Sequence, residues 1–196
     1  PLVTSGSATA ILVVQATAYP AGRPQAILLK GIDPGQKILK IPSALLDVKP
    51  VEDIPGLIGQ RMARETGLKP GDSVTVRWRN AQGAFDARDI VITGWMNTSV
   101  PSVDDHQIWV PLERLGSMLN VSGQATLVVL ARSTRNPGED RTWVFHDPDF
   151  LLKDLRQLVK TKSLSNLVVY LLLLFMGLLA IFDTQVLAIF RRRKEI

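Results

Sequence analysis

Acidic residues and histidines stand together at two places in the chain, and such clusters could bind a metal ion or transfer a proton. Residues 104–106 read Asp-Asp-His, and residues 146–149 read His-Asp-Pro-Asp. Metal sites usually draw converging ligands from at least two elements, whereas each of these clusters is local in sequence. We therefore interpret both clusters as solvated turns and predict neither a metal site nor a bound cofactor.

Residues for covalent or hydrolytic catalysis are scarce. The chain has two histidines and no cysteine, and it contains none of the patterns Gly-x-Ser-x-Gly, Gly-x-x-x-x-Gly-Lys or His-Glu-x-x-His. A membrane-anchored enzyme would need a pocket of titratable side chains, which a single sequence does not reveal. The missing patterns favour a protein that is not an enzyme.

The positive charge of the chain does not indicate nucleic-acid binding. The formal net charge is +5, but residues 1–162 hold 19 Lys and Arg against 16 Asp and Glu, which leaves +3 for that part. These charges are interspersed, without the basic stripe or interleaved aromatic residues of a nucleic-acid surface. No nucleic-acid partner is predicted.

A long uncharged segment near the C-terminus predicts a membrane-spanning helix. Ser163–Phe182 holds no Asp, Glu, Lys, Arg or His over 20 residues, and a helix of that length covers the ~30 Å hydrocarbon core of a bilayer. From Leu167 to Phe182, 12 of 16 residues are Leu, Val, Ile or Phe. They contribute about −4 to −7 kcal/mol to insertion, whereas one off-centre aspartate costs less than ~3 kcal/mol. Insertion is therefore favoured over burial in a soluble core.

Basic residues flank this span in equal number, so their count alone does not orient it. Four precede the span (Lys153, Arg156, Lys160 and Lys162), and four consecutive ones follow it (Arg191, Arg192, Arg193 and Lys194). Because cytoplasmic flanks are rich in Lys and Arg, the contiguity of the second group favours a cytoplasmic C-terminal end.

Residues 1–162 are predicted to form one α+β domain. The expected strands lie in 7–35, 73–79, 84–96, 107–111 and 124–132, and the expected helices lie at 57–67, 112–119 and 149–162. Residues 37–56 are weakly patterned, which predicts a short helix and loops. Pro70 and Gly71 predict a type II turn between the first helix and the following strand, since Gly71 accepts a positive φ.

The order of these segments resembles the MacB/FtsX-like superfamily of ABC transporter permeases, and most closely the LolC/LolE lipoprotein-releasing type. The residues that carry the resemblance are "LLKGIDP", "LIGQRMARETGLKPGDSVTV", "IVITGW", "DDHQIWVPLERLGSML" and "ATLVVLA", followed by the span and "RRRKEI". The resemblance covers nearly the whole chain, and "GLKPGD" and "RRRKEI" are its best local signals.

The resemblance implies three regions: an extracytoplasmic (periplasmic) domain at 1–162, a transmembrane helix at 163–190, and the start of a cytoplasmic coupling segment at 191–196. In the family this segment reads Glu-Arg-x-x-Glu-Ile-Gly, so Arg192, Glu195 and Ile196 match it, and Arg193 lies inside it. Arg191 departs from the usual acidic residue. Because Pro1 is not an initiator methionine, the chain is expected to be a fragment that lacks the family's first membrane helix.

The resemblance also implies partners and a location. ATP hydrolysis would come from a separate ABC-type ATPase subunit, and a second permease subunit would complete a homo- or heterodimer in the lipid bilayer of the bacterial inner membrane. No residue discriminates among lipoprotein, lipid, peptide and small hydrophobic drug as substrates. A single-pass membrane sensor with an extracytoplasmic ligand-binding domain is the alternative interpretation.

Two polar residues directly after the span are candidates for the membrane interface. If Ser163 lies at the outer interface, 20 residues exhaust the hydrocarbon thickness, and Asp183 and Gln185 then lie at the inner interface, where a carboxylate is hydrated. We interpret them as anchoring or helix-packing groups in preference to a transport site. Asparagine is more usual at this point in the family, which favours a hydrogen-bonding role.

Overall fold

The computed structural model describes residues 6–48, 53–98, 104–132, 134 and 143–192. It divides the chain into two compact units, residues 1–135 and 136–196. Within the described residues, the first unit holds seven strands and two short α-helices, and the second holds one long helix. The prediction of an α+β fold followed by an apolar helix is confirmed.

The strands follow closely the alternation of apolar and polar residues in the sequence. They are β1 (Ala8–Ala18), β2 (Gln25–Ile32), β3 (Ile54–Gly59), β4 (Ser73–Arg79), β5 (Phe85–Met96), β6 (Gln107–Pro111) and β7 (Leu127–Leu130). In β4, for example, Val74, Val76 and Trp78 are buried while the residues between them are exposed, because successive side chains of a strand point to opposite faces. Short 3₁₀ turns lie at Pro20–Gly22 (η1) and Ser43–Leu46 (η2).

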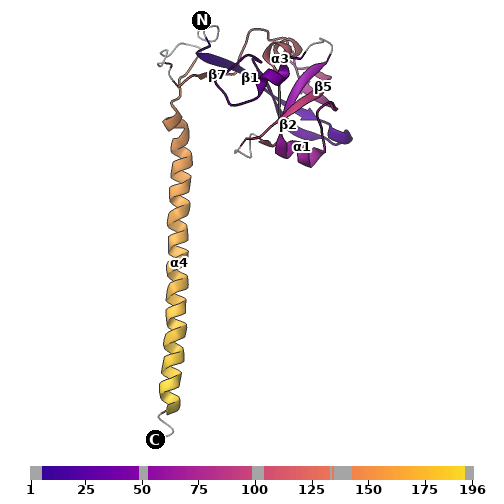
Figure 1. The fold of residues 1–196 in the computed structure, drawn as a ribbon. Helices are drawn as coiled ribbons and strands as arrows, with labels where there is room; N and C mark the ends of the chain where they lie inside the picture. Colours follow the sequence, from indigo (N-terminus) through magenta and orange to yellow (C-terminus); the bar gives the residue numbers. More distant parts are fainter. Residues whose placement is uncertain (1–5, 49–52, 99–103, 133, 135–142, 193–196) are drawn as a thin grey trace. The chain divides into compact units, whose positions relative to one another are not determined.

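Strand β1 closes the sheet on itself. The strand order is β2-β6-β3-β5-β4-β1-β7, and β1 also pairs with β2. Residues Ala16–Ala18 pair with β2 on one side and with β4 on the other, so six strands form a ring. Strand β7 adds to this ring along Ala8–Ile11, and Figure 1 shows it beside β1. Closure leaves few unpaired edges in the sheet.

Two apolar clusters occupy opposite faces of the sheet. Neighbouring residues of β1 divide between them, since Leu12 belongs to the larger cluster and Ile11 to the smaller. The larger cluster includes Trp78 and is completed by helices α1 (Gln60–Thr66) and α3 (Leu112–Leu119). The smaller cluster includes Trp109 and is covered in part by Leu39 and Ile41 of the loop after β2.

Lys30 lies at the edge of the smaller cluster. Its Nζ atom is 5.0 Å from the centroid of the Trp109 ring, a cation–π contact. Burial lowers the pKa of the Lys30 ammonium, because desolvation disfavours the charged form. The aromatic ring therefore offsets part of the cost of placing this charge against the core.

Strand β3 was not predicted from the sequence. We expected loops up to residue 56 and a helix from 57, but Ile54–Gly59 is a fully buried strand, parallel to β5 and antiparallel to β6. The helix begins only at Gln60. Pro55 and Gly56 argue against a central strand, yet a Cβ at Gly56 would overlap Ile90 Cγ2. The glycine is therefore explained by close strand packing, not by a turn.

The predicted joint after α1 is confirmed. Gly67 ends α1 with a φ of 77°, and the turn that follows is closed by a hydrogen bond of 3.0 Å from Asp72 N to Lys69 O. Gly71 has a φ of 95°, a conformation that glycine adopts without a steric penalty. Strand β4 then begins at Ser73.

Asp104 caps helix α1 from a distant part of the chain. Its carboxylate oxygens accept hydrogen bonds from the backbone N–H groups of Gln60 (3.2 Å) and Arg61 (3.1 Å), and the residue is only 8% exposed. A Cβ at Gly59 would overlap the Asp104 carbonyl oxygen, so the glycine permits this approach. Our interpretation of Asp104 as part of a solvated turn is wrong, because the carboxylate satisfies donors at a helix N-terminus.

We expect Asp104→Ala to lower the free energy of unfolding by about 1–2 kcal/mol, since it removes the cap and leaves two N–H groups without their acceptor. Asp105→Ala is the matched control. Asp105 forms an ion pair of 3.4 Å with Arg61, which is half exposed, and such pairs contribute about 0–1 kcal/mol. Denaturant unfolding of the chain in detergent, followed by tryptophan fluorescence, measures both; equal losses would contradict the capping role.

Candidate membrane helix and coupling segment

Helix α4 (Pro148–Arg192) begins at a residue that the sequence marks as a cap. The Asp147 carboxylate accepts a hydrogen bond of 3.2 Å from Asp149 N, and Pro148 occupies the first helical position, where no N–H is needed. The ring of His146 stacks on that of Phe150 at 4.9 Å. This second acidic cluster is exposed, as expected, but it forms the start of a helix and not a turn.

No proline interrupts α4 after Pro148, and Gly177 is its one glycine. The helix accordingly runs for 45 residues without a break, as Figure 1 shows. At about 1.5 Å per residue it is about 68 Å long, more than twice the ~30 Å core of a bilayer. It includes both the amphipathic helix predicted at 149–162 and the span predicted at 163–190.

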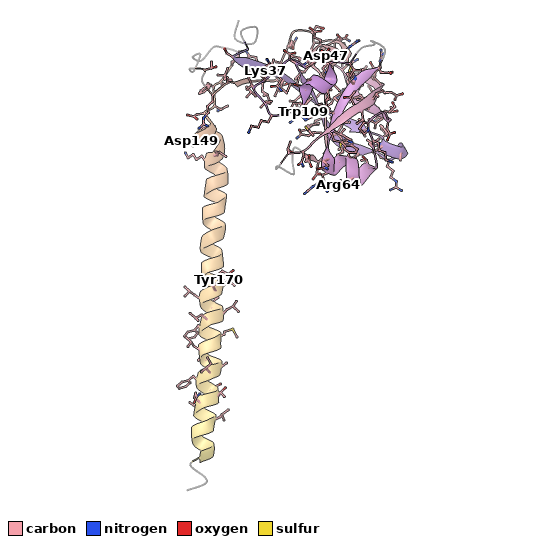
Figure 2. All side chains as sticks on the ribbon, in the orientation of Figure 1. Lys37, Asp47, Arg64, Trp109, Asp149 and Tyr170 are labelled. Carbon is pink, nitrogen blue, oxygen red and sulfur yellow. The ribbon has the colours of Figure 1, made fainter. Side chains whose placement is uncertain are left out.

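The C-terminal half of α4 holds a stretch that is long and apolar enough to cross a membrane. Val169–Leu187 has a mean hydropathy of 2.0 over 19 residues, and none of it is buried within the protein. Leu171, Leu174 and Phe175 are each more than half exposed, and Figure 2 shows side chains projecting from the helix around Tyr170. Such a surface is typical of a helix that meets lipid or another apolar partner.

The predicted interface residues lie on this helix. Asp183 and Gln185 are exposed, and between them the Thr184 hydroxyl donates a hydrogen bond of 2.7 Å to Ala180 O. The uncharged segment ends at Phe182, and the most apolar stretch ends at Leu187. Asp183 is within about one helical turn of either end, so both limits are compatible with a position at the interface.

The residues of the predicted coupling segment divide at the end of α4. Arg192 is the last residue of the helix, and Arg193, Glu195 and Ile196 lie outside the described residues. Their assignment to a coupling segment stays a prediction. The predicted domain limit at 162 falls inside α4, whereas the division into compact units comes at 135.

The first unit has a groove that was not predicted from the sequence. We call it the β4 groove. It has a volume of about 780 Å³ and is lined by Gln15–Thr17, Ala26–Leu28, Arg77–Arg79, Phe85 and Asp105–Gln107. Its arginines stand in the strand sequence Arg-Trp-Arg, a pattern that places two cations on one face. The Arg-Trp-Arg pattern was the available sequence signal for this groove. The other lining residues are distant from it in the sequence.

Comparison with known proteins leaves the family of the chain open. No protein-family model matches it, and no curated protein does. Among solved structures it is similar to the extracellular domain of YknZ, a noncanonic ABC-type transporter from Gram-positive bacteria, with 18% identity and a TM-score of 0.43. The match covers 65% of this chain and 65% of the other, which is slightly less than two thirds of each.

We expect a charge in the middle of the uncharged segment Ser163–Phe182 to oppose insertion far more than a change directly after its end. Leu173→Arg should raise the free energy of insertion by about 2.5–3.5 kcal/mol, because an arginine at a helix centre lies in the hydrocarbon core. Asp183→Asn, the control, should change it little. A glycosylation-based insertion assay on residues 148–192 measures both. Equal insertion of the Leu173→Arg and unmodified segments would contradict a membrane span.

Proposed function

We propose that the chain is part of a membrane permease subunit of an ABC transporter. The observation that carries the proposal is the unbroken helix α4, which holds an apolar stretch and a basic end in one element and begins 21 residues before that stretch. Of its 45 residues, 19 form the apolar stretch, and the residues before it extend about 30 Å further. A helix of this kind can carry a displacement from one side of a bilayer to the other.

The proposed orientation places the basic end in the cytoplasm and residues 1–162 outside. Arg191, Arg192, Arg193 and Lys194 are contiguous, and each basic residue near an anionic cytoplasmic leaflet contributes about 1 kcal/mol. The four basic residues on the other side are spread over ten positions. A concentrated charge is the stronger anchor because all of it lies within a Debye length of the surface.

The proposed mechanism is mechanical, with the chemistry in a partner. The chain holds no Gly-x-x-x-x-Gly-Lys loop for nucleotide phosphates, so ATP hydrolysis would belong to a separate ATPase subunit. Closure of the ATPases would act on the segment from Arg192 to Ile196 and displace α4. The displacement would then move the extracytoplasmic domain, and a second permease subunit would complete the transporter.

Within this proposal, release of lipoproteins from the bacterial inner membrane is the more specific function, as in the LolC/LolE type. It rests on the sequence resemblance described above. A single-pass sensor would use the same helix to signal inward, so the continuity of α4 alone does not distinguish a sensor from a permease. Dependence on an ATPase does, because a sensor needs no ATP-driven partner.

We expect the double substitution Arg192→Ala and Glu195→Ala, made in the full-length protein with its ATPase, to uncouple hydrolysis from transport. Transport per ATP hydrolysed should fall about tenfold, which corresponds to a coupling free energy of about 1.4 kcal/mol. Transport and phosphate release in reconstituted vesicles give the ratio directly.

Arg191→Ala is the matched control, since Arg191 departs from the family motif and should leave the ratio unchanged. Membrane content of each variant is measured in parallel to separate coupling from insertion. Normal transport by the double variant would contradict the coupling segment, and full activity without any ATPase would contradict the permease.

A further inference from the structure

The β4 groove lies on the face of the sheet that carries the smaller apolar cluster. Ala16, Ile27 and Trp78 are among its lining residues, and they belong to the larger cluster on the opposite face. Their neighbours Gln15, Thr17, Arg77 and Arg79 therefore point to the groove side, because side chains alternate along a strand. Thr17 pairs with Arg77 across β1 and β4, so hydroxyl and guanidinium groups share one surface.

Two arginines give the groove its charge. Arg77 and Arg79 are exposed and stand two residues apart on β4, a spacing of about 7 Å. No described carboxylate forms an ion pair with either guanidinium. Arg77 lies over the Phe85 ring at 4.7 Å, and Arg79 Nε donates a hydrogen bond of 2.7 Å to Gly83 O. A guanidinium has five N–H donors, so most of them are available to a ligand.

The acidic residue in the groove lining does not cancel this charge. Oδ2 of Asp105 forms an ion pair with Arg61 on helix α1, at 3.4 Å, whereas Oδ1 has no hydrogen-bond partner among the described residues. Asp105 is the single carboxylate in the lining beside two arginines, so the charge of the lining stays positive. His106 has a φ of 54°, which is uncommon for a residue with a side chain. Its carbonyl oxygen accepts a hydrogen bond of 2.8 Å from Leu28 N. This bond fixes the wall of the groove opposite the arginines.

Most of the accessible lining surface of the groove is apolar. Ala26 and Leu28 lie on β2 beside Gln15 and Thr17 of β1, and Phe85 is 68% exposed at the end of the groove. A volume of about 780 Å³ is within the range of small-molecule sites. The surface thus combines fixed cationic forks, hydrogen-bonding side chains and one accessible aromatic ring.

We propose that the β4 groove binds a small organic anion, one that carries a phosphate or carboxylate group beside an apolar part. The paired N–H donors of each arginine guanidinium match the oxygen geometry of phosphate and carboxylate. Phe85 contacts the apolar part of the ligand. Gln15 and Thr17 donate or accept hydrogen bonds along the body of the ligand. This site lies wholly within residues 1–135 and does not depend on the permease function.

The test uses 1-naphthyl phosphate, a fluorescent aryl phosphate, titrated into the full 196-residue chain in maltoside micelles. We expect saturable binding, and we expect the double variant Arg77→Gln, Arg79→Gln to weaken it at least tenfold. Arg64→Gln is the matched control, because Arg64, labelled in Figure 2, is an exposed arginine on α1 that does not line the groove. Its binding should equal that of the unmodified chain.

Phe85→Leu separates the two parts of the site, since it should weaken naphthyl phosphate while leaving competition by inorganic phosphate unchanged. Near-ultraviolet circular dichroism checks that each variant is folded. No binding at millimolar probe, or equal binding by the Arg77/Arg79 double variant and the Arg64→Gln control, would overturn the proposal, and the arginines would then be solvated surface residues.

Two competitors identify the source of the anion. Displacement by glycerol 1-phosphate points to a soluble phosphate ester, and displacement only by short-chain phosphatidic acid points to a lipid head group. Either result supports the site. Failure of both to displace the probe would overturn it, because the probe would then be held by its ring alone.

Discussion

Helix α4 exposes leucine, valine, isoleucine and phenylalanine side chains on every side between Val169 and Leu187. Contact between such an apolar surface and water is unfavourable. None of that stretch is buried within the protein, and burying one such side chain is worth about 1.5–3 kcal/mol. The need to cover this surface favours placement of the helix in a bilayer. Once it is placed there, the basic residues after Phe190 and the polar residues at 183–185 fall near an interface, where charge is hydrated.

The first unit meets a different constraint, which is closure. Residues Ala16–Ala18 of β1 pair on both edges, so the sheet has a ring of strands and an interior that holds Trp78, Ile92 and Leu115. Loops that join distant parts of the ring are held in place by polar side chains. Asp104, for example, accepts hydrogen bonds at the start of α1. The result is a domain with a defined outer surface, and the β4 groove is part of that surface.

Patterns that are local in sequence predicted most of this fold. The alternation of apolar and polar residues predicted the positions of β1, β2, β4 and β5, and residue types predicted the turn at Pro70 and Gly71. They also predicted two helices, at 149–162 and 163–190, which the structure joins into the single helix α4. Strand β3 was missed because Pro55 and Gly56 read as a loop, and their role depends on Ile90 of another strand. The cap formed by Asp104 and the β4 groove were missed for the same reason, since each joins segments that only the tertiary fold brings together.

The membrane topology of the chain is the most direct test of the account. Because the chain has no cysteine, a reagent that labels cysteine reports only on an introduced one. A single cysteine is introduced at Lys37, exposed in the first unit and labelled in Figure 2, or at Arg192, the last residue of α4. Intact bacterial spheroplasts expressing each variant are treated with a membrane-impermeant maleimide before and after permeabilisation. The account predicts that Lys37→Cys is labelled in intact spheroplasts and that Arg192→Cys is labelled only after permeabilisation. Labelling of both, or of neither, in intact spheroplasts would contradict a helix that crosses the membrane with residues 1–135 outside.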